Sequence, residues 1–282
     1  MDTLQDKVVV VTGGASGIGL AFARAVADLG GHPVVADIDT AALERVAPTL
    51  PEGTLVVPTD VSDLASVEAL RDAALDRYGR VDVVFNNAGV STFNLLSDTT
   101  IDDWRWVLGV DLWGVIHGVH TFLPVIKAQG TPAHIVSTAS VAGILSGVAV
   151  IGPYAVAKVG VVSLSETLRQ EVAIEGLPIG VSVLCPSATD TAMMEAERNR
   201  PAGMDPEQRT ELAEAWRAGI GAQMTSEVGK SPEEVAAQVV DAILHDRFWI
   251  ITHSDLTPAF EARFAEIMSN APREDAEGED AQ

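Results

Sequence analysis

The sequence has a single cysteine, Cys185, among its 282 residues. One thiol cannot form a disulfide within the chain and leaves no cysteine cluster for zinc, which fits a reducing compartment. The N-terminus, MDTLQDKVVVV, has acidic residues where a signal peptide needs basic ones, and no run approaches the roughly 18 apolar residues of a membrane span. These absences predict a soluble cytoplasmic protein without a membrane partner.

Basic residues are also scarce, because 18 Lys and Arg stand against 40 Asp and Glu, and the formal net charge is -22. Such a chain would repel nucleic-acid phosphates, which argues against a nucleic-acid partner. Five of the acidic residues lie in residues 271–282, which contain no large apolar residue. We therefore predict a disordered acidic tail over this segment.

Short apolar runs rich in β-branched residues alternate with longer segments of helical periodicity. The runs are apolar on both faces, as strands buried in a parallel sheet are. This order predicts an α/β fold, a Rossmann-type doubly wound parallel sheet of about seven strands with helices on both faces, in one domain over residues 1–270. The candidate strands are KVVVVTGG, HPVVAD, GTLVVPTD, VDVVFNNAG, HIVSTAS, IGVSVLCP and FWIITH, and the candidate helices span residues 17–29, 40–47, 62–78, 101–128, 154–175 and 231–244.

Residues 191–229 form an insert that is too long for an ordinary loop. The insert contains helical stretches and a set of large apolar side chains. A mobile lid with an apolar underside is favoured over a structural excursion that packs on the sheet edge. The apolar side chains of the insert are Met193, Met194, Met204, Trp216 and Met224.

Three glycines stand directly after the first strand and at the start of the next helix, in TGGASGIG. Gly13 would allow a sharp turn, Gly17 a close approach of a pyrophosphate to the backbone, and Gly19 close packing of helix on strand. The positive end of the helix dipole would then face the phosphates. This context predicts a dinucleotide site.

Asp37 ends the second strand, eighteen residues after Gly19. A carboxylate at this position can accept hydrogen bonds from the adenosine ribose and would repel a 2′-phosphate. Residues 36–42 contain no Arg or Lys to receive such a phosphate, so we expect NAD(H) as the cofactor. The alternative role of capping the following helix fits Asp39 better.

Tyr154 is one of only two tyrosines, and Lys158, one of four lysines, follows it by one helical turn in PYAVAK. Residues four apart lie on the same face of a helix, so the ammonium could lie beside the phenol. The spacing permits chemistry without establishing it, because such a pair also occurs by chance on helix surfaces.

These motifs form an ordered set with DV at residues 60–61, NNAG at residues 86–89, and Ser140 fourteen residues before Tyr154. The set resembles the short-chain dehydrogenase/reductase family over about residues 7–253. The resemblance implies an enzyme that moves hydride between a nicotinamide and an alcohol or carbonyl carbon, usually as a homotetramer and otherwise as a homodimer. It implies cofactor contacts from Gly13, Ser16, Gly17, Ile18, Gly19, Asp37, Ile38, Asp60, Val61, Asn87, Ala88, Gly89, Tyr154, Lys158, Pro186, Thr189 and Thr191.

The chemistry of the central residues agrees with this resemblance. No side chain supplies hydride, so a nicotinamide must supply it, and the developing alkoxide needs a proton. Tyr154 can hold or accept this proton, and the charges of Lys158 and of oxidised nicotinamide are expected to lower the tyrosine pKa towards working pH. Lys158 can also hold the nicotinamide ribose, while Ser140 can orient the substrate oxygen.

Two positions depart from the family pattern. Asp111 stands where the family usually has an Asn that helps to hold a water between the lysine and solvent. A carboxylate buried there would either pair with Lys158 or take up a proton, and we expect a working relay with altered pH dependence. Ser187 replaces the usual glycine after the sixth strand, where Thr189 is expected to face the carboxamide and Thr191 the amide or a phosphate.

The substrate pocket is expected to be apolar, bounded by the lid, and without a cation to fix an acidic substrate. A steroid, a terpenoid alcohol, or a cyclic or aryl ketone would fit. The alternatives are a catalytically silent NAD-responsive binding protein and a non-redox lyase on the same fold, although the lyase should have Arg in place of Lys158. The expected substrate-binding residues are Ser140, Val141, Ala142, Val150, Tyr154 and Met193.

Other conspicuous side chains carry less weight. His117 and His120 lie one turn apart, but no carboxylate or cysteine completes a ligand set, so we predict no metal site. Trp104, Trp106 and Trp113 occur in one helical region, where a core or subunit interface is a better account than stacking on a ligand.

Overall fold

The seven apolar runs form the strands of one parallel sheet in the computed structural model, which describes residues 1–145 and 147–270. The strand order is β3-β2-β1-β4-β5-β6-β7, and every neighbouring pair is parallel. The fold prediction is confirmed. The strands are β1 (Val8–Thr12), β2 (His32–Asp37), β3 (Leu55–Pro58), β4 (Val83–Asn86), β5 (Ala133–Thr138), β6 (Ile179–Cys185) and β7 (Trp249–Ile251).

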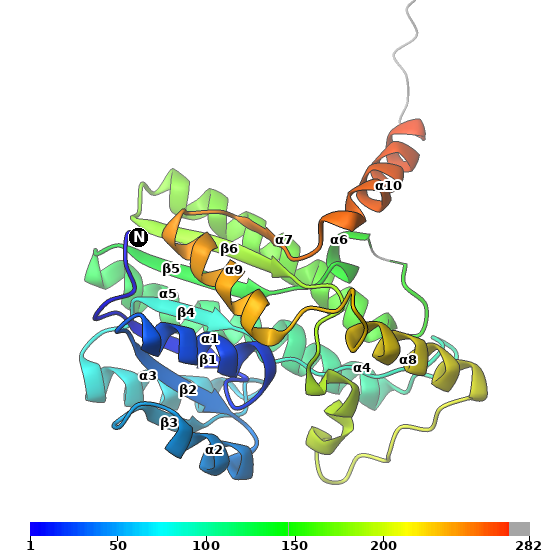
Figure 1. Cartoon of the computed structure of the whole chain (residues 1–282), viewed down its shortest axis with the longest axis horizontal. Coiled ribbons are helices and arrows are strands. Elements are labelled where there is room, and N and C mark those ends of the chain that lie inside the picture. The colour runs from blue at the N-terminus through cyan, green and yellow to red at the C-terminus, as the bar shows by residue number, and fades with distance from the viewer. Residues whose placement is uncertain (146, 271–282) are drawn as a thin grey trace, which may run out of the picture. The chain divides into compact units, whose positions relative to one another are not determined.

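Helices cover both faces of the sheet, and each face has its own apolar core (Figure 1). On one face, Leu70 of α3 (Leu64–Tyr78) and Phe122 of α5 (Gly114–Gln129) pack in the core. On the other face, Phe22 of α1 (Gly17–Asp28) and Val239 of α9 (Pro232–Leu244) do so. Burial of strands on both faces explains their continuous apolar sequence. The α-helices between the first residue and Thr252 are α1 (Gly17–Asp28), α2 (Thr40–Val46), α3 (Leu64–Tyr78), α4 (Ile101–Leu108), α5 (Gly114–Gln129), α6 (Ala142–Leu145), α7 (Gly152–Ile174), α8 (Glu211–Met224) and α9 (Pro232–Leu244).

The predicted helix starts are set by side-chain caps. Asp39 accepts the Ala42 N–H at 2.8 Å, and Ser231 forms a capping box with Glu234. The helix predicted from residue 62 begins at Leu64, with Asp63 as its N-cap. Each cap satisfies helix N–H groups that have no partner within the helix.

Residues 101–128, predicted as one helix, are divided by a π-helical turn, Gly109–Trp113, between α4 and α5. By length and composition alone, Ile101–Gln129 could cross a membrane, with a hydropathy of 1.2 over its most apolar window. The helix is nevertheless not an unbroken apolar run, because it contains charged residues such as Asp103 and Asp111. In this structure 44% of that window is buried, and a single helix of this kind is weak evidence for a membrane span.

The chain divides into two units, Met1–Thr252 and His253–Gln282. The first contains the sheet and all helices described so far. The second contains a short 3-10 turn and α10 (Thr257–Ser269), which was not predicted from the sequence. The single domain over residues 1–270 stays a prediction, and the predicted tail at residues 271–282 lies outside the described residues.

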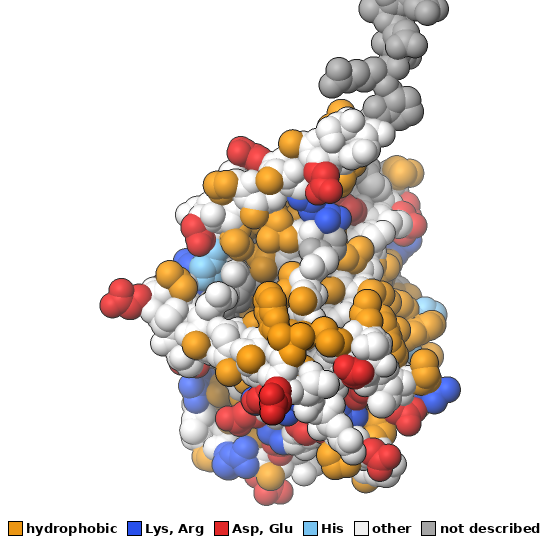
Figure 2. Space-filling model, turned by 90° about the vertical axis from the view of Figure 1, so that its right-hand side faces the viewer, with side chains coloured by type: hydrophobic (Ala, Val, Ile, Leu, Met, Phe, Trp, Pro, Cys, Tyr) orange, Lys and Arg blue, Asp and Glu red, His pale blue; other side chains and the backbone are white. Residues whose placement is uncertain are grey.

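The insert at residues 191–229 contains a 3-10 helical segment, Ala192–Asn199, and α8. Ala213 on α8 is fully buried and belongs to a small apolar cluster with Phe93 and Ile151. Leu212 and Trp216 on the same helix are about half exposed. Figure 2 shows the molecule from the side where α4 and α8 lie in Figure 1, with hydrophobic side chains gathered over the middle of the face. We call residues 191–229 the lid from here on.

Candidate active site

A cavity of about 520 Å³ lies at the carboxyl ends of the strands, on both sides of the neighbouring strands β1 and β4. Ligands of open α/β sheets bind at this edge, where the strand order reverses. Three of the predicted site residues, Gly19, Asp111 and Val150, do not line it. Those that do are Gly13, Ser16, Gly17, Ile18, Asp37, Ile38, Asp60, Val61, Asn87, Ala88, Gly89, Ser140, Val141, Ala142, Tyr154, Lys158, Pro186, Thr189, Thr191 and Met193.

The glycine loop has the shape that its sequence predicts. Gly13 has φ +62°, and a Cβ there would lie 2.8 Å from the Ala88 Cα. Gly17 has φ +50° and starts α1, while a Cβ at Gly19 would lie 2.3 Å from the carbonyl oxygen of Gly13. Gly19 therefore serves the packing of helix on loop, and Gly13 and Gly17 serve the turn and the open surface of the cavity.

The helix N-terminus beside this loop suits a phosphate. Ser16 is the N-cap of α1, yet its side chain makes no capping hydrogen bond within the described part of the chain. Its hydroxyl and the first N–H groups of α1 can therefore serve a ligand, with the helix dipole adding to the attraction. The residues present thus fit the pyrophosphate of a dinucleotide.

Asp37 lies at the end of β2 and is held by backbone donors. Its Oδ2 accepts the Ala15 N–H at 3.0 Å, and its Oδ1 accepts the Asp39 N–H at 3.1 Å. Each carboxylate oxygen keeps a free lone pair for a ribose hydroxyl. Asp60 accepts hydrogen bonds from the N–H and the hydroxyl of Ser62 at 2.9 and 2.6 Å.

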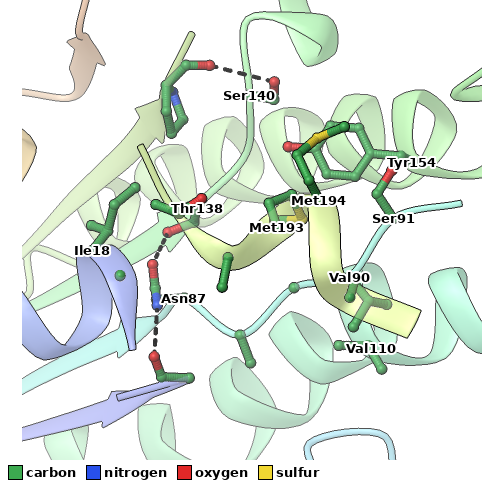
Figure 3. Close-up of a pocket in the computed structure, with 18 of the residues that line it drawn as sticks. Ile18, Asn87, Val90, Ser91, Val110, Thr138, Ser140, Tyr154, Met193 and Met194 are labelled. Carbon is green, nitrogen blue, oxygen red and sulfur yellow. Dashed lines mark hydrogen bonds between the residues drawn. The ribbon is translucent and has the colours of Figure 1, made fainter. Parts of the chain in front are cut away.

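Asn87 braces the ends of three strands (Figure 3). Its Nδ2 donates to the Thr12 carbonyl at 3.1 Å, and its Oδ1 accepts the Thr138 hydroxyl at 3.2 Å. The backbone N–H of Asn87 donates to the Thr12 hydroxyl at 3.0 Å. The Asn87 side chain therefore joins the strand ends that line this part of the cavity.

Ser140, Tyr154 and Lys158 converge at one end of the cavity. Ser140 follows β5, and its hydroxyl accepts the Ala142 N–H at 3.1 Å. Tyr154 lies in the first turn of α7, and the Lys158 Nζ, one turn later, is 5.3 Å from the centre of the phenol ring. The sequence spacing of Tyr154 and Lys158 thus places phenol and ammonium together, as predicted.

Lys158 is buried and held by two oxygen partners. Its Nζ donates to the Thr138 carbonyl at 2.9 Å and lies 3.0 Å from the Asp111 Oδ2. An ammonium has three donors, so one remains for a ligand in the cavity. Burial alone would lower the pKa of Lys158, but the facing carboxylate of Asp111 and the Tyr154 phenol raise it, and the net direction is upward.

Asp111 pairs with Lys158, which is one of the two outcomes expected from the sequence. It lies in the π-helical turn, is fully buried, and accepts the Val90 N–H at 2.8 Å through its Oδ1. π-Helical turns in long helices frequently occur at functional sites. Burial raises the pKa of Asp111, and the Lys158 ammonium and the Val90 N–H offset this only in part.

Gly89 lies against this ion pair. A Cβ at position 89 would be 3.1 Å from the Asp111 Oδ2 and 3.5 Å from the Lys158 Nζ. Both side chains are held by a second contact, to Val90 and to Thr138 respectively. The absence of a side chain at Gly89 therefore leaves space for the ion pair of Asp111 and Lys158.

The pKa of Tyr154 is raised, not lowered as expected from its charged neighbour. Burial is the largest cause, and the Asp111 carboxylate raises the pKa further. Lys158 and a hydrogen bond with Ser140 lower it, but less than burial raises it. The protein without cofactor therefore holds Tyr154 as a neutral phenol at neutral pH.

Val150 does not line the cavity, which corrects its predicted role in substrate binding. Its backbone has φ +62°, its carbonyl accepts the Asn94 N–H, and its side chain packs in the cluster with Phe93 and Ala142. The neighbouring Ile151 lines the cavity instead.

The rest of the wall is mostly apolar. Met193 and Met194 reach it from the lid, and Figure 3 shows Met194 beside Tyr154. Trp106 is buried in an apolar cluster, which confirms its prediction as a core residue, and it also lines the cavity. Trp216 of the lid is not among the lining residues. Met224, one of the apolar side chains expected in the lid, also lines the cavity. No sequence motif identified the further wall residues Ser91, Phe93, Val110, Val148, Ile151, Ala196 and Ile220.

Arg198 also lines the cavity, so the expectation of no nearby cation needs a correction. Its guanidinium donates to the carbonyls of Ala192 and Glu195 at 2.8 and 2.9 Å. The Arg198 guanidinium therefore binds backbone carbonyls within the lid, and no hydrogen bond joins it to Tyr154 among the described residues.

No group of three or more potential metal ligands occurs among the residues described by the structure. The His117 Nδ1 lies 2.9 Å from the Val61 carbonyl, and its ring lies near that of Trp113.

Cys185 is fully buried at the end of β6, and burial raises the pKa of its thiol to about 12.

The chain is similar to known dehydrogenases. A family model described as short chain dehydrogenase matches residues 7–202. The chain is 34% identical over 285 residues to C alpha-dehydrogenase of Sphingobium sp. strain SYK-6, covering 99% of this chain and 91% of that protein. It is 33% identical over 276 residues to 1-deoxy-11-beta-hydroxypentalenate dehydrogenase of Streptomyces arenae, covering 95% and 90% of the two chains.

The fold also matches a solved structure closely. The crystal structure of a short chain dehydrogenase/reductase from Burkholderia phymatum in complex with NAD gives a TM-score of 0.91 at 39% identity, over 96% of this chain and 98% of that one. The chain therefore belongs to the short-chain dehydrogenase/reductase family, whose members are oxidoreductases that use a nicotinamide cofactor on small molecules.

Proposed function

We propose that the protein is an NAD(H)-dependent oxidoreductase that interconverts a secondary alcohol and a ketone on a fairly apolar small molecule. The observation that carries this proposal is the convergence of Ser140, Tyr154 and Lys158 at one end of a cavity with a mostly apolar wall. Dehydrogenases among the similar proteins, named for a hydroxypentalenate and for a C alpha position, support it. A steroid, a terpenoid, or a cyclic or aryl compound would suit such a wall.

The glycine loop and the α1 N-terminus would hold the cofactor pyrophosphate, and Asp37 the adenosine ribose. When bound, the nicotinamide supplies or accepts the hydride. The Ser140 hydroxyl donates a hydrogen bond to the substrate oxygen and fixes it beside the phenol. The Tyr154 hydroxyl gives its proton to that oxygen in reduction and takes it back in oxidation. The free donor of Lys158 would hold the nicotinamide ribose.

The raised pKa of Tyr154 fits this role in one direction without further help. A neutral phenol is the form that gives a proton to a ketone oxygen. Because the raised pKa keeps Tyr154 neutral when no oxidised nicotinamide adds its positive charge, the site is in the protonation state that ketone reduction needs. Oxidation needs the phenolate, which the Lys158 ammonium stabilises against the opposing effects of burial and of Asp111.

A substrate panel tests the proposed function. Cyclic, aryl and terpenoid secondary alcohols and ketones, with short diols as small polar controls, are assayed with NAD(H) and NADP(H) in parallel. We expect turnover of the apolar members with NAD(H). Tight NAD binding with no turnover of any member would favour a silent NAD-responsive protein, and product formation without cofactor conversion would favour a lyase.

Replacing Asp37 with asparagine should relax cofactor choice. The variant keeps an acceptor for the Ala15 N–H but loses the charge that would repel a 2′-phosphate. Loss of a charge-assisted hydrogen bond of about 1.5–3 kcal/mol should lower kcat/KM with NAD roughly 10- to 100-fold, while NADP is used better than by the wild type. Asp39→Asn is the control, since it removes the same charge from a residue that caps α2. An unchanged ratio of kcat/KM values in Asp37→Asn would disprove the role.

Replacing Asp111 with asparagine should move the pH–rate profile of alcohol oxidation towards lower pH. The Asp111 carboxylate raises the pKa of Tyr154, so its removal lowers that pKa and the phenolate forms at a lower pH. Oxidation rates across the pH range, measured at saturating NAD, check this. Profiles of variant and wild type that superimpose would remove any role for the charge.

The assembly and location of the protein stay predictions. We expect a cytoplasmic homotetramer or homodimer. Exposed apolar side chains on the surfaces of the π-helical turn and α7 support an interface there: Trp113 is 53% exposed and Val156 is 51% exposed.

A further inference from the structure

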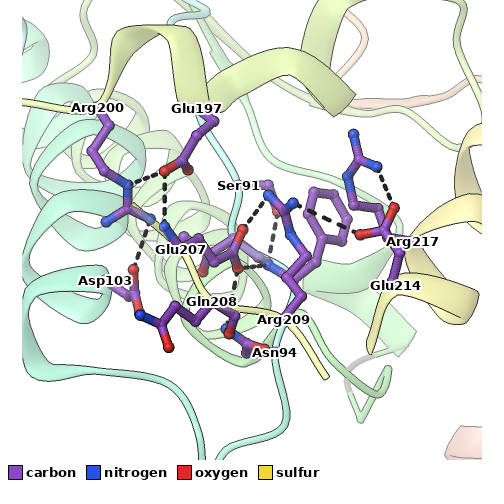
Figure 4. Close-up of polar contacts among 12 residues, drawn as sticks. Ser91, Asn94, Asp103, Glu197, Arg200, Glu207, Gln208, Arg209, Glu214 and Arg217 are labelled. Carbon is purple, nitrogen blue, oxygen red and sulfur yellow. Dashed lines mark hydrogen bonds and ion pairs between the residues drawn. The ribbon is translucent and has the colours of Figure 1, made fainter. Parts of the chain in front are cut away.

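Two contacts hold the lid against the wall of the cavity (Figure 4). One joins Arg200 of the lid to Asp103 of α4, and we call it the Arg200 anchor. The other joins Glu207 of the lid to the backbone of Phe93, and we call it the Glu207 latch. Glu197 links them within the lid, because its Oε1 pairs with the Arg200 Nε at 2.6 Å and accepts the Glu207 N–H at 3.0 Å. Both contacts adjoin residues of the cavity wall, because Phe93 lines the cavity and Arg200 covers Trp106, which also lines it.

The Arg200 anchor is a buried ion pair between the lid and helix α4. The Arg200 Nη2 lies 2.8 Å from the Asp103 Oδ1, and the two side chains are 6% and 3% exposed. The guanidinium also lies 4.7 Å from the centre of the Trp106 ring. Asp103 is fixed in turn by the capping box with Thr100. Separating this pair would leave two opposite charges without their partners, which is strongly unfavourable when the charges are buried.

The Glu207 latch has a different composition. The Glu207 side chain is fully buried, and its Oε1 accepts the Phe93 N–H and faces the Asn94 Nδ2 at 3.5 Å. The Asn94 Nδ2 also donates to the Gln208 carbonyl at 2.9 Å. The ionic partner of Glu207 is Arg209, at 2.5 Å, and this arginine belongs to the lid itself.

This difference decides which contact can open. If the lid lifts at Glu207, its carboxylate leaves neutral N–H groups and its own N–H leaves Glu197, while Arg209 stays paired. Hydrogen bonds are then broken, but no ion pair is. If the lid lifts at Arg200, an ion pair between two elements is broken. We propose that Glu207 is a positioning residue that seals the substrate cavity, and that the lid opens at Glu207 while the Arg200 anchor stays closed.

The latch also contacts the segment that leads into the catalytic helix. The Asn94 N–H donates to the Val150 carbonyl at 2.8 Å, two residues before α7 begins. Val150 has φ +62°, a conformation that a β-branched residue keeps only where its surroundings hold it. Closure at Glu207 would therefore also support the turn from which α7 carries Tyr154.

The latch is tested first by a measurement that needs no activity. Hydrogen exchange of the Phe93 amide reports opening, because this N–H is the one that Glu207 accepts. We expect exchange to be roughly 10-fold faster or more in Glu207→Ala, and faster to a smaller extent in Glu207→Gln, which keeps an acceptor oxygen but loses the charge. Glu211→Gln removes the same charge from an exposed position on α8 and should exchange as the wild type does. Wild-type exchange in both Glu207 variants would overturn the proposal.

Trypsin cleavage tests which end opens. Cleavage after Arg209, on the latch side, should be faster in Glu207→Ala, whereas cleavage after Arg198, on the anchor side, should keep the wild-type rate. Faster cleavage after Arg198 but not after Arg209 would show that the lid opens at the anchor instead, contrary to the proposal.

The kinetic consequence rests on the proposed function. With an apolar substrate from the panel, KM should rise roughly 10-fold in Glu207→Ala while kcat changes less, because the lid supplies Met193 and Met194 to the substrate wall. KM for NAD should stay within about twofold. A fall in kcat alone would overturn the positioning role. If no substrate is turned over by the wild type, the proposed function fails while the exchange and cleavage results still decide the latch.

Discussion

Replacing Tyr154 with phenylalanine should lower kcat at least about 10³-fold, the upper part of the range for loss of a general acid or base. The variant removes one oxygen atom and leaves the ring, its packing and the Lys158 ion pair in place. NAD affinity should therefore stay within about twofold of the wild-type value. Steady-state rates in both directions and titration of NAD by tryptophan fluorescence measure the two effects.

Tyr78, the second tyrosine of the chain, provides the matched control. Its hydroxyl lies 3.5 Å from the Gly53 carbonyl, and its ring stacks on His32, far along the chain from the cavity residues. Tyr78→Phe should leave kcat unchanged. Turnover by Tyr154→Phe within tenfold of the wild type would refute the assignment of Tyr154 as acid and base.

Replacing Asp111 with alanine should lower the free energy of unfolding by about 3–5 kcal/mol, because it leaves the buried Lys158 ammonium without its counter-ion. It also leaves the Val90 N–H without its acceptor. Urea unfolding followed by tryptophan fluorescence gives this difference. A loss of less than 1 kcal/mol would contradict the view that the pair is ionised and desolvated.

Two further variants separate the charge from the hydrogen bond. Asp111→Asn keeps an acceptor for Val90 and a partner for Lys158, so it should cost less than Asp111→Ala. The double variant Asp111→Leu with Lys158→Met removes both charges and should cost less than either Asp111→Leu or Lys158→Met alone. Additive losses in the double variant would mean that the two groups do not interact.

Local patterns in the sequence were sufficient for the sheet, the glycine loop and the Tyr154 pair. A strand buried on both faces must be apolar throughout, and a turn with positive φ at Gly13 needs a glycine, so these features are visible without any knowledge of distant contacts. The pairing of Tyr154 and Lys158 follows from helical spacing alone.

The features that were missed depend on contacts between distant segments. Phe93 and Ile220 line the cavity together, and no local pattern states where residues 191–229 will lie relative to the rest of the wall. Val150 was expected in the cavity wall. Its positive φ and the hydrogen bond from the Asn94 N–H to its carbonyl instead accompany a side chain that packs in the apolar cluster with Phe93. The pKa of Tyr154 depends on how deeply the phenol is buried, which helical spacing does not reveal.

The close approach of Gly89 to the ion pair has a consequence for how this site can change in evolution. A Cβ at position 89 would lie in ordinary contact with the Lys158 Nζ at 3.5 Å but too close to the Asp111 Oδ2, at 3.1 Å, and Asp111 is held by its hydrogen bond from Val90. We expect that, among related chains, residues larger than glycine at position 89 occur together with a smaller residue at position 111. The two positions should covary, so an ancestor that exchanged one of them first would have passed through a less stable intermediate.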